Sequence, residues 1–178
     1  MRVIAGSRKG HRISAPKGRD TRPTSDRVRE NSFNLIGPVD GATVLDLFAG
    51  SGAMGIEALS RGAERATFVE NDVKTTHVIQ ENLEKLRLDG ARVVREDAVR
   101  ALATEASAGR KYDLVLVDPP YDLYDELQPA LARYLPDVLT DDGVVVVETT
   151  ARTEPDLTPL TVRTSRKYGA VRVTLFER

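Results

Sequence analysis

The sequence predicts an α/β fold with a doubly wound, mainly parallel sheet of seven strands, and three observations support it. From residue 43 onward, short apolar runs alternate with longer amphipathic stretches, which is the pattern of repeated βα units. A glycine-rich turn, Gly50–Gly55, follows the first of these apolar runs. Two further apolar runs, separated by a turn, close the chain and predict an antiparallel strand at the C-terminal end.

The residues before this pattern are expected to form an extension, 1–36, that precedes an α/β domain at 37–178. Residues 2–5 and 11–14 can pair as a short hairpin across an intervening glycine turn. Residues 23–25, Pro-Thr-Ser, suit the start of a helix that runs to the end of the extension. Proline fits the first turn of a helix, and the two hydroxyl groups can cap it.

The extension is basic, whereas the rest of the chain is acidic. Residues 1–30 hold nine lysines and arginines against three acidic residues, so that segment carries about +6 and the remainder about −7 of a total of −1. A basic segment on an acidic body indicates a nucleic-acid partner, and a solvated terminus is the alternative. The expected phosphate contacts come from Arg8, Lys9, Arg12, Arg19 and Arg22.

The chain beyond residue 42 divides into alternating strands and helices. The helix candidates carry apolar residues three and four positions apart, as Ile79, Leu83 and Leu86 do. The expected strands are 43–48, 65–70, 91–95, 112–117 and 143–148, and the expected helices between them are 53–61, 72–87, 98–107 and 124–135. The last two strands, at 158–166 and 170–177, are expected to form a hairpin that adds an antiparallel strand at the edge of the sheet.

The glycine-rich turn carries the first functional motif. Gly50-Ser51-Gly52-Ala53-Met54-Gly55 matches the G-x-G-x-x-G pattern of dinucleotide sites, so an NAD-dependent oxidoreductase is one interpretation. Asp46 within the strand, followed by Phe48 and Ala49, resembles instead motif I of S-adenosylmethionine-dependent methyltransferases. In that motif the glycines let the backbone approach the methionyl group, and the acid helps to hold the ammonium group.

Acids at the ends of the next two strands extend this candidate cofactor site. Glu70-Asn71 ends the second strand, where a carboxylate can accept hydrogen bonds from both hydroxyls of a ribose. That role suits NAD and S-adenosylmethionine equally. Asp97-Ala98 follows the third strand, and Asp97 can accept from an adenine amine, cap the next helix, or do both.

The most informative stretch is Asp118-Pro119-Pro120-Tyr121, directly after the apolar run 114–117. It is the signature of amino-methyltransferases, although a strand end with a Pro-Pro turn is the simpler alternative. An exocyclic amine is a poor nucleophile because its lone pair is delocalised into the ring. Asp118 and the carbonyl of Pro119 can accept both N–H bonds and stabilise the developing charge. The prolines restrict the backbone, Tyr121 can stack on a base that has flipped out, and Asp118 also borders the cofactor.

The chain resembles the bacterial 16S ribosomal RNA guanine-N2 methyltransferase family RsmD over nearly its whole length. The segments that carry the resemblance are Arg2–Gly10, Arg22–Asn34, Leu45–Ala63, Phe68–Glu70 and Lys167–Gly169. The resemblance implies a Rossmann-like class I methyltransferase fold with S-adenosylmethionine as cofactor. It also implies methylation of guanine(966)-N2, on a flipped base in 16S rRNA of the small ribosomal subunit or its assembly intermediate.

Two other functions are compatible with parts of this pattern. A DNA adenine-N6 or cytosine-N4 methyltransferase shares the tetrapeptide, but such enzymes commonly add a target-recognition domain, and only about 55 residues follow Tyr121. A non-catalytic RNA-binding ribosome assembly factor would not need an intact tetrapeptide.

The chain has no cysteine, two separated histidines and no apolar run that could span a bilayer. We therefore expect a monomeric cytoplasmic protein without a metal or membrane partner.

Overall fold

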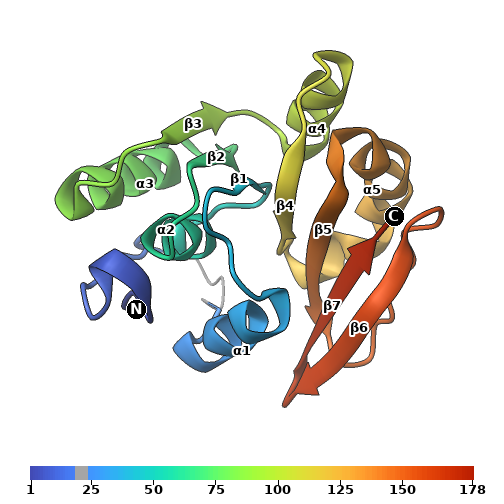
Figure 1. Ribbon diagram of the computed structural model, residues 1–178, viewed down its shortest axis with the longest axis horizontal. Coiled ribbons are helices and arrows are strands. Elements are labelled where there is room, and N and C mark those ends of the chain that lie inside the picture. Colours follow the sequence, from blue (N-terminus) through green and yellow to red (C-terminus); the bar gives the residue numbers. More distant parts are fainter. Residues whose placement is uncertain (19–23) are drawn as a thin grey trace.

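The computed structural model describes residues 1–18 and 24–178 and has one seven-stranded sheet with the strand order β3-β2-β1-β4-β5-β7-β6 (Figure 1). The strands are β1 (Thr43–Asp46), β2 (Arg65–Glu70), β3 (Ala91–Arg95), β4 (Tyr112–Val117), β5 (Leu139–Thr150), β6 (Thr161–Tyr168) and β7 (Val171–Glu177). The α-helices are α1 (Asp26–Ile36), α2 (Ala53–Ser60), α3 (Val73–Leu86), α4 (Ala98–Ser107) and α5 (Tyr124–Val138), and two short 3₁₀ turns are η1 (Gly6–Arg8) and η2 (Tyr121–Leu123).

The predicted doubly wound α/β fold is confirmed. Strands β1 to β5 are parallel to one another, and β1 lies between β2 and β4. The strand order therefore reverses at β1, and open α/β sheets bind ligands at the carboxyl ends of the strands beside such a point. The glycine-rich turn after β1 and the tetrapeptide after β4 consequently lie side by side.

The expected closing hairpin with antiparallel strands is confirmed. The last strand, β7, pairs antiparallel with β5 and lies inside the sheet, whereas β6 pairs antiparallel with β7 and forms the edge. Burial explains the order, because six of the seven residues of β7 are buried while the residues of β6 are exposed or half-buried. The more apolar strand takes the position with a neighbour on each side.

Two apolar clusters fill the space between the sheet and its helices. One contains Phe33 of α1, Ile56 of α2 and Ile79 of α3, and the other contains Leu102 of α4 and Leu135 of α5. Helix α5 extends past its predicted end because Leu131, Leu135 and Val138 are fully buried on one face of it. Within the residues that the structure describes, no helix is long and apolar enough to cross a membrane.

The N-terminal residues pack against α2 instead of standing apart from the sheet. The predicted hairpin is reduced to one antiparallel bridge between Arg2 and Arg12. The fully buried carboxylate of Glu57 in α2 accepts hydrogen bonds from the backbone N–H groups of Ile4 (2.9 Å) and Ala5 (3.0 Å). Val3 belongs to the same apolar cluster as α1 and α2, so the extension shares its core with the domain.

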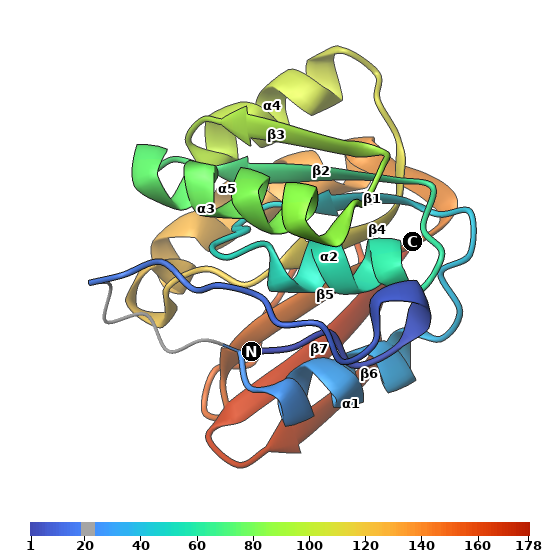
Figure 2. The same ribbon diagram turned by 90° about the vertical axis from the view of Figure 1, so that its left-hand side faces the viewer.

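The two ends of the sheet are occupied by different parts of the extension. The dark blue turn η1 lies at the end opposite the carboxyl ends of β2 and β3 (Figure 2). The chain then returns along α2 and α3 toward the strand carboxyl ends, where Ser14 exchanges backbone hydrogen bonds with the side chain of Asn82 (2.9 and 3.0 Å). Ser25 caps α1 by accepting from the N–H of Val28, as predicted.

Candidate functional site

The glycine-rich turn places three glycines in different roles. Gly50 and Gly52 have φ angles of 54° and 83°, which side chains rarely adopt. A Cβ atom on Gly50 would meet nothing within 4 Å, so this backbone faces open space, whereas one on Gly52 would press on Ile56 and Ile79 at 3.3 Å. A Cβ on Gly55 would lie 2.4 Å from the ring of Phe68, so that glycine is required for α2 to pack on β2.

Two buried carboxylates hold this turn from below. Asp46, at the end of β1, accepts a hydrogen bond from the N–H of Gly55 (3.0 Å). Glu70, at the end of β2, accepts from the N–H of Gly50 (3.1 Å) and of Asp72 (3.1 Å). These backbone donors fix the carboxylate of Glu70 at the mouth of the turn, in the position expected for a ribose-binding acid.

The remaining predicted cofactor residues surround this turn. Asp97 is exposed and caps α4 by accepting from the N–H of Arg100 (3.0 Å), which confirms its capping role. Ala98 beside it is buried, and Asn71 after β2 is exposed. Phe48 and Ser51 are half-buried, and Ala49 is buried.

A second group of side chains meets where the tetrapeptide leaves β4. The carboxylate of Asp118 accepts a hydrogen bond from the hydroxyl of Thr24 (2.8 Å). The same hydroxyl lies 3.4 Å from a carboxylate oxygen of Glu148, near the end of β5. Tyr121 donates its hydroxyl to the other oxygen of Glu148 (3.0 Å). The predicted catalytic residues Asp118, Pro119, Pro120 and Tyr121 thus sit at one corner with two side chains that the motif does not include.

The corner and the glycine turn are electrostatically linked. Burial raises the pKa of Asp118 to about 6, although the hydrogen bond from Thr24 acts against the shift. Burial also raises the pKa of Asp46 to about 7; the Gly55 hydrogen bond opposes this, and the negative charges of Asp118 and Glu70 add to it. Several acids at one sheet edge therefore create a site whose charge a cationic ligand would relieve.

These features fit S-adenosylmethionine, which carries a sulfonium and an ammonium group. The open face of Gly50 leaves room for a ligand against the backbone, beside the carboxylate of Glu70 that accepts from its N–H. Burial raises the pKa of Asp46 to about 7, and a nearby ammonium group would favour the ionised form of this carboxyl. No group of acids and histidines among the described residues could hold a metal ion.

A cavity of about 380 Å³ adjoins the catalytic corner. Its wall includes Thr24, Tyr121 and Glu148 of the corner. It is also lined by the start of α1 and by residues 167–171, which comprise the end of β6, the turn and the first residue of β7. The cavity therefore lies between the catalytic corner, α1 and the closing hairpin.

Sequence reasoning missed three residues of the site. Thr24 and Glu148 flank Asp118, and Asn82 of α3 joins the backbone of Ser14 to the carbonyl of Ser51 (3.0 Å) in the glycine turn. Glu148 had a signal, because it is an acid at the end of the apolar run that became β5. Thr24 and Asn82 offered no such sequence signal, since each forms its hydrogen bonds with residues that are distant in sequence.

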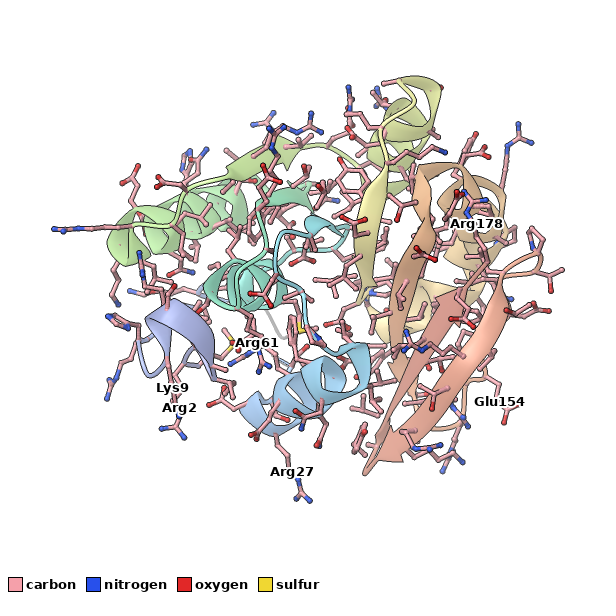
Figure 3. All side chains as sticks on the ribbon, viewed as in Figure 1. Arg2, Lys9, Arg27, Arg61, Glu154 and Arg178 are labelled. Carbon is pink, nitrogen blue, oxygen red and sulfur yellow. The ribbon has the colours of Figure 1, made fainter. Side chains whose placement is uncertain are left out.

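The predicted RNA-contacting cations are scattered. Arg8 donates through its guanidinium to the carbonyls of Leu86 (2.5 Å) and Arg87 (2.9 Å) at the C-terminal end of α3. Lys9 directly follows this turn and is exposed, whereas Arg27 projects from α1 (Figure 3). Arg12 is also exposed. Arg19 and Arg22 lie outside the described residues.

Comparison with known proteins agrees with this geometry. A family model described as Conserved hypothetical protein 95 matches residues 1–177. The Ribosomal RNA small subunit methyltransferase D of Escherichia coli (strain K12) is 43% identical over 122 residues, which cover 68% of this chain and 60% of that protein. The chain belongs to this family. The predicted resemblance to RsmD is thereby confirmed.

Two further relatives match the RsmD-family chain over its full length. YlbH of Bacillus subtilis (strain 168) is 41% identical over 184 residues, covering 100% of this chain and 99% of that protein. The solved structure of the Escherichia coli protein yhhF has a TM-score of 0.84 and 35% identity, and the match covers 100% of this chain and 97% of that one. The extension at residues 1–36 is therefore included in both matches.

Proposed function

We propose that this RsmD-family protein transfers a methyl group from S-adenosylmethionine to the exocyclic amine of guanine(966) in 16S rRNA of the small ribosomal subunit. The observation that carries the proposal is the half-buried carboxylate of Asp118, which accepts from Thr24, a residue that lines the cavity. An acid in this position can accept the N–H bonds of a flipped base next to a sulfonium site. The relative in Escherichia coli is named for methylation of small-subunit rRNA.

The cofactor residues divide the work of binding. Glu70 accepts from the ribose hydroxyls, and the backbone at Gly50 and Ser51 lies along the methionyl group. Asp46, which is buried, and Asp118, which is half-buried, offset the positive charge of the ligand, and desolvation raises the pKa of both carboxyls. Asp97, already a helix cap, accepts from the adenine amine in addition.

The tetrapeptide then acts on the target amine. S-adenosylmethionine supplies an electrophilic methyl group on sulfur. Asp118 and the carbonyl of Pro119 accept the two N–H bonds, which directs the nitrogen lone pair toward that methyl group and stabilises charge developing on nitrogen. The methylated nitrogen must lose one proton, and Asp118, with a pKa of about 6, can receive it near neutral pH. Tyr121 stacks on the base.

The RNA partner requires a flipped guanine and contacts to the surrounding phosphates. We infer that the principal contacts come from the cations beside the cavity, and that Lys9, Arg12, Arg19 and Arg22 make weaker, more peripheral contacts. Arg8 is the weakest member of the predicted set, because its guanidinium already binds the end of α3. Its replacement would loosen the packing of the extension as well as remove a charge.

The test offers labelled S-adenosylmethionine with three substrates: small subunits lacking the modification, naked 16S rRNA, and duplex DNA. Digestion and mass spectrometry then identify the methylated nucleoside, with Asp118→Asn as the inactive control. We expect N2-methylguanosine at one position of the rRNA. Methylated adenine or cytosine in DNA would favour the DNA methyltransferase, and no transfer to any substrate would favour the assembly factor.

A further inference from the structure

The cavity beside the catalytic corner has the size and lining of a ligand pocket. Its volume of about 380 Å³ lies within the range of about 300–1,000 Å³ that small-ligand pockets occupy. The aromatic rings of Tyr121 and Tyr168 line it, together with the carboxylate of Glu148. A planar base could lie between these groups with its polar edge toward Glu148.

The carboxylate of Glu148 is fixed by its surroundings. Glu148 is 9% exposed and pairs with Val173 in the sheet, so its backbone cannot shift easily. One oxygen accepts from the hydroxyl of Tyr121 (3.0 Å), and the other lies 3.4 Å from the hydroxyl of Thr24. A carboxylate has about four acceptor positions, so it can accept hydrogen bonds from several donors at once.

Glu148 and Asp118 lie on either side of one hydroxyl group. Thr24 donates to Asp118 at 2.8 Å and lies within 3.4 Å of Glu148. Two carboxylates so close together can address two neighbouring donors on the same edge of one ligand. Guanine presents such a pair, because its N1–H and its 2-amino group are adjacent on its Watson–Crick edge, whereas adenine presents an acceptor at N1.

We propose that the cavity receives the target base and that Glu148 selects guanine by accepting a hydrogen bond from its N1–H. This inference rests on the proposed function, since Asp118 must hold the 2-amino group at the same time. A base with a lone pair at N1 would face the carboxylate with no donor between them, and buried acceptors that face each other are costly. Recognition of this edge is how enzymes read a base that has left its stack.

The mouth of the cavity supports a nucleic-acid occupant. Arg27 of α1 and Lys167 at the end of β6 are exposed and line its rim. Arg27 projects from α1 away from the sheet (Figure 3). Cations on both sides of a pocket with an acidic floor suit a base whose flanking phosphates stay outside.

The test compares guanine with 2-aminopurine, which keeps the 2-amino group but has an acceptor at N1. Small subunits are reconstituted from 16S rRNA with either base at the target position, and kcat/KM for methyl transfer is measured for wild type, Glu148→Gln and the control Glu64→Gln. Glu64 is exposed and precedes β2. Melting temperature and the Kd of the cofactor are measured alongside, to establish that the fold and the cofactor site are intact.

We expect wild type and Glu64→Gln to prefer guanine at least tenfold, since a hydrogen-bonding contact to a base edge discriminates against a base that presents the wrong group there. Glu148→Gln should bring the ratio close to one, because an amide can donate to N1 of 2-aminopurine. Changing both the residue (Glu148→Gln) and the base (guanine to 2-aminopurine) forms a double-mutant cycle, which separates the N1 contact from the other differences between the two bases. An unchanged ratio in Glu148→Gln would overturn the inference while leaving the proposed function in place.

A second variant covers the case in which Glu148→Gln does not fold. Glu148→Asp keeps the charge but withdraws it by one methylene, so kcat/KM for guanine should fall at least tenfold while the Kd of the cofactor stays the same. Equal kcat/KM in Glu148→Asp and wild type would contradict the contact. If wild type transfers no methyl group to the guanine subunits, the proposed function fails first and this inference falls with it.

Discussion

Asp118 is the residue on which the proposed chemistry depends most directly. Its carboxylate is held by Thr24, so its position does not depend on bound cofactor. We expect Asp118→Ala to lower kcat by about 10²–10³, the effect of removing one preorganised polar contact to a developing charge. The Kd of S-adenosylmethionine should change much less. Transfer assays and calorimetry separate the two effects, and equal losses would reassign Asp118 to cofactor binding.

Asp46 is expected to link stability, pH and cofactor binding. Its pKa is raised to about 7 from an ordinary value of 3.8, so the folded protein resists ionisation of this group. The stability it contributes is complete below pH 3.8 and is lost as the pH rises through 7. Asp46→Asn keeps an acceptor for Gly55 but removes the charge.

We therefore predict that Asp46→Asn melts at a higher temperature than wild type at pH 8 without cofactor, by roughly 2–4 °C for each kcal/mol regained. The two proteins should differ less at pH 5. Cofactor affinity should rise with pH through 7 in wild type and stay weak and flat in the variant. Calorimetric titrations at pH 6 and 8 check this, and a pH-independent difference in Kd would remove Asp46 from the site.

At the same residue scale, the sequence revealed the groups that lie in contiguous motifs. Asp118, Gly50 and Glu70 were found because each follows an apolar run, and the carboxyl ends of parallel strands meet at one edge. Glu148 offered the same signal, an acid at the end of an apolar run, but its contact with the tetrapeptide could not be predicted. Thr24 offered no signal, because its role depends on how the extension meets the tetrapeptide, and motif spacing carries no information about such contacts.

At the scale of elements, a substitution in the glycine turn can distinguish an effect on cofactor binding from an effect on folding stability. Gly50→Ala adds a methyl group that meets no protein atom within 4 Å, at a φ of 54° that costs about 1–2 kcal/mol. We predict a small loss of stability and a much larger loss of cofactor affinity, because the methyl group enters the space meant for the ligand. Gly109→Ala is the matched control, with a φ of 69° and nothing within 4 Å.

Thermal melts and cofactor titrations of both alanine variants test whether Gly50→Ala weakens cofactor binding more than it lowers stability. Equal effects of Gly50→Ala and Gly109→Ala on cofactor Kd would mean that the turn has only a structural role. Gly55 is unsuitable for this comparison, since any side chain there would collide with Phe68 in the core.

The periodicity of apolar residues predicted most helices and strands, but it did not predict the features that depend on tertiary packing. Strands β2, β3 and β4 begin and end where the apolar runs do. The position of β7 inside the sheet was not predictable from the hairpin pattern alone, because the choice of partner depends on which strand buries more surface. Helix α5 continued through Pro129 and Pro136 for the same reason, since burial of its apolar face outweighs local breaking signals.

At the scale of the whole molecule, the charge asymmetry is real but its placement required the fold. Residues 1–30 are basic, yet η1 lies at the end of the sheet opposite the candidate site (Figure 2). Arg27 and Lys167, distant in sequence, both line the cavity because the start of α1 and the end of β6 contribute to its wall. The extension cannot simply be deleted to test its charges.

Removal of the N-terminal residues would leave the carboxylate of Glu57 without the backbone donors of Ile4 and Ala5. Glu57 also pairs with the buried Arg29 (3.6 Å) and with Arg61 (2.9 Å). A buried acceptor left without a hydrogen-bond donor costs about 1–3 kcal/mol, so a truncated protein would report its loss of stability instead of its RNA contacts. Single substitutions of exposed cations are the appropriate probes.

The RNA-binding face is therefore predicted to centre on the cavity rim. Each phosphate contact that is lost should lower the slope of log K against log salt by about 0.7–0.9. We expect Arg27→Ala and Lys167→Ala each to flatten the salt dependence of small-subunit binding by that amount. Lys9→Ala is the matched control: it also removes one exposed positive charge, but next to η1, at the end of the sheet opposite the candidate site. It should change the slope less. Binding across a salt series measures all three, and a larger effect of Lys9→Ala than of the rim variants would move the RNA surface to the N-terminal turn.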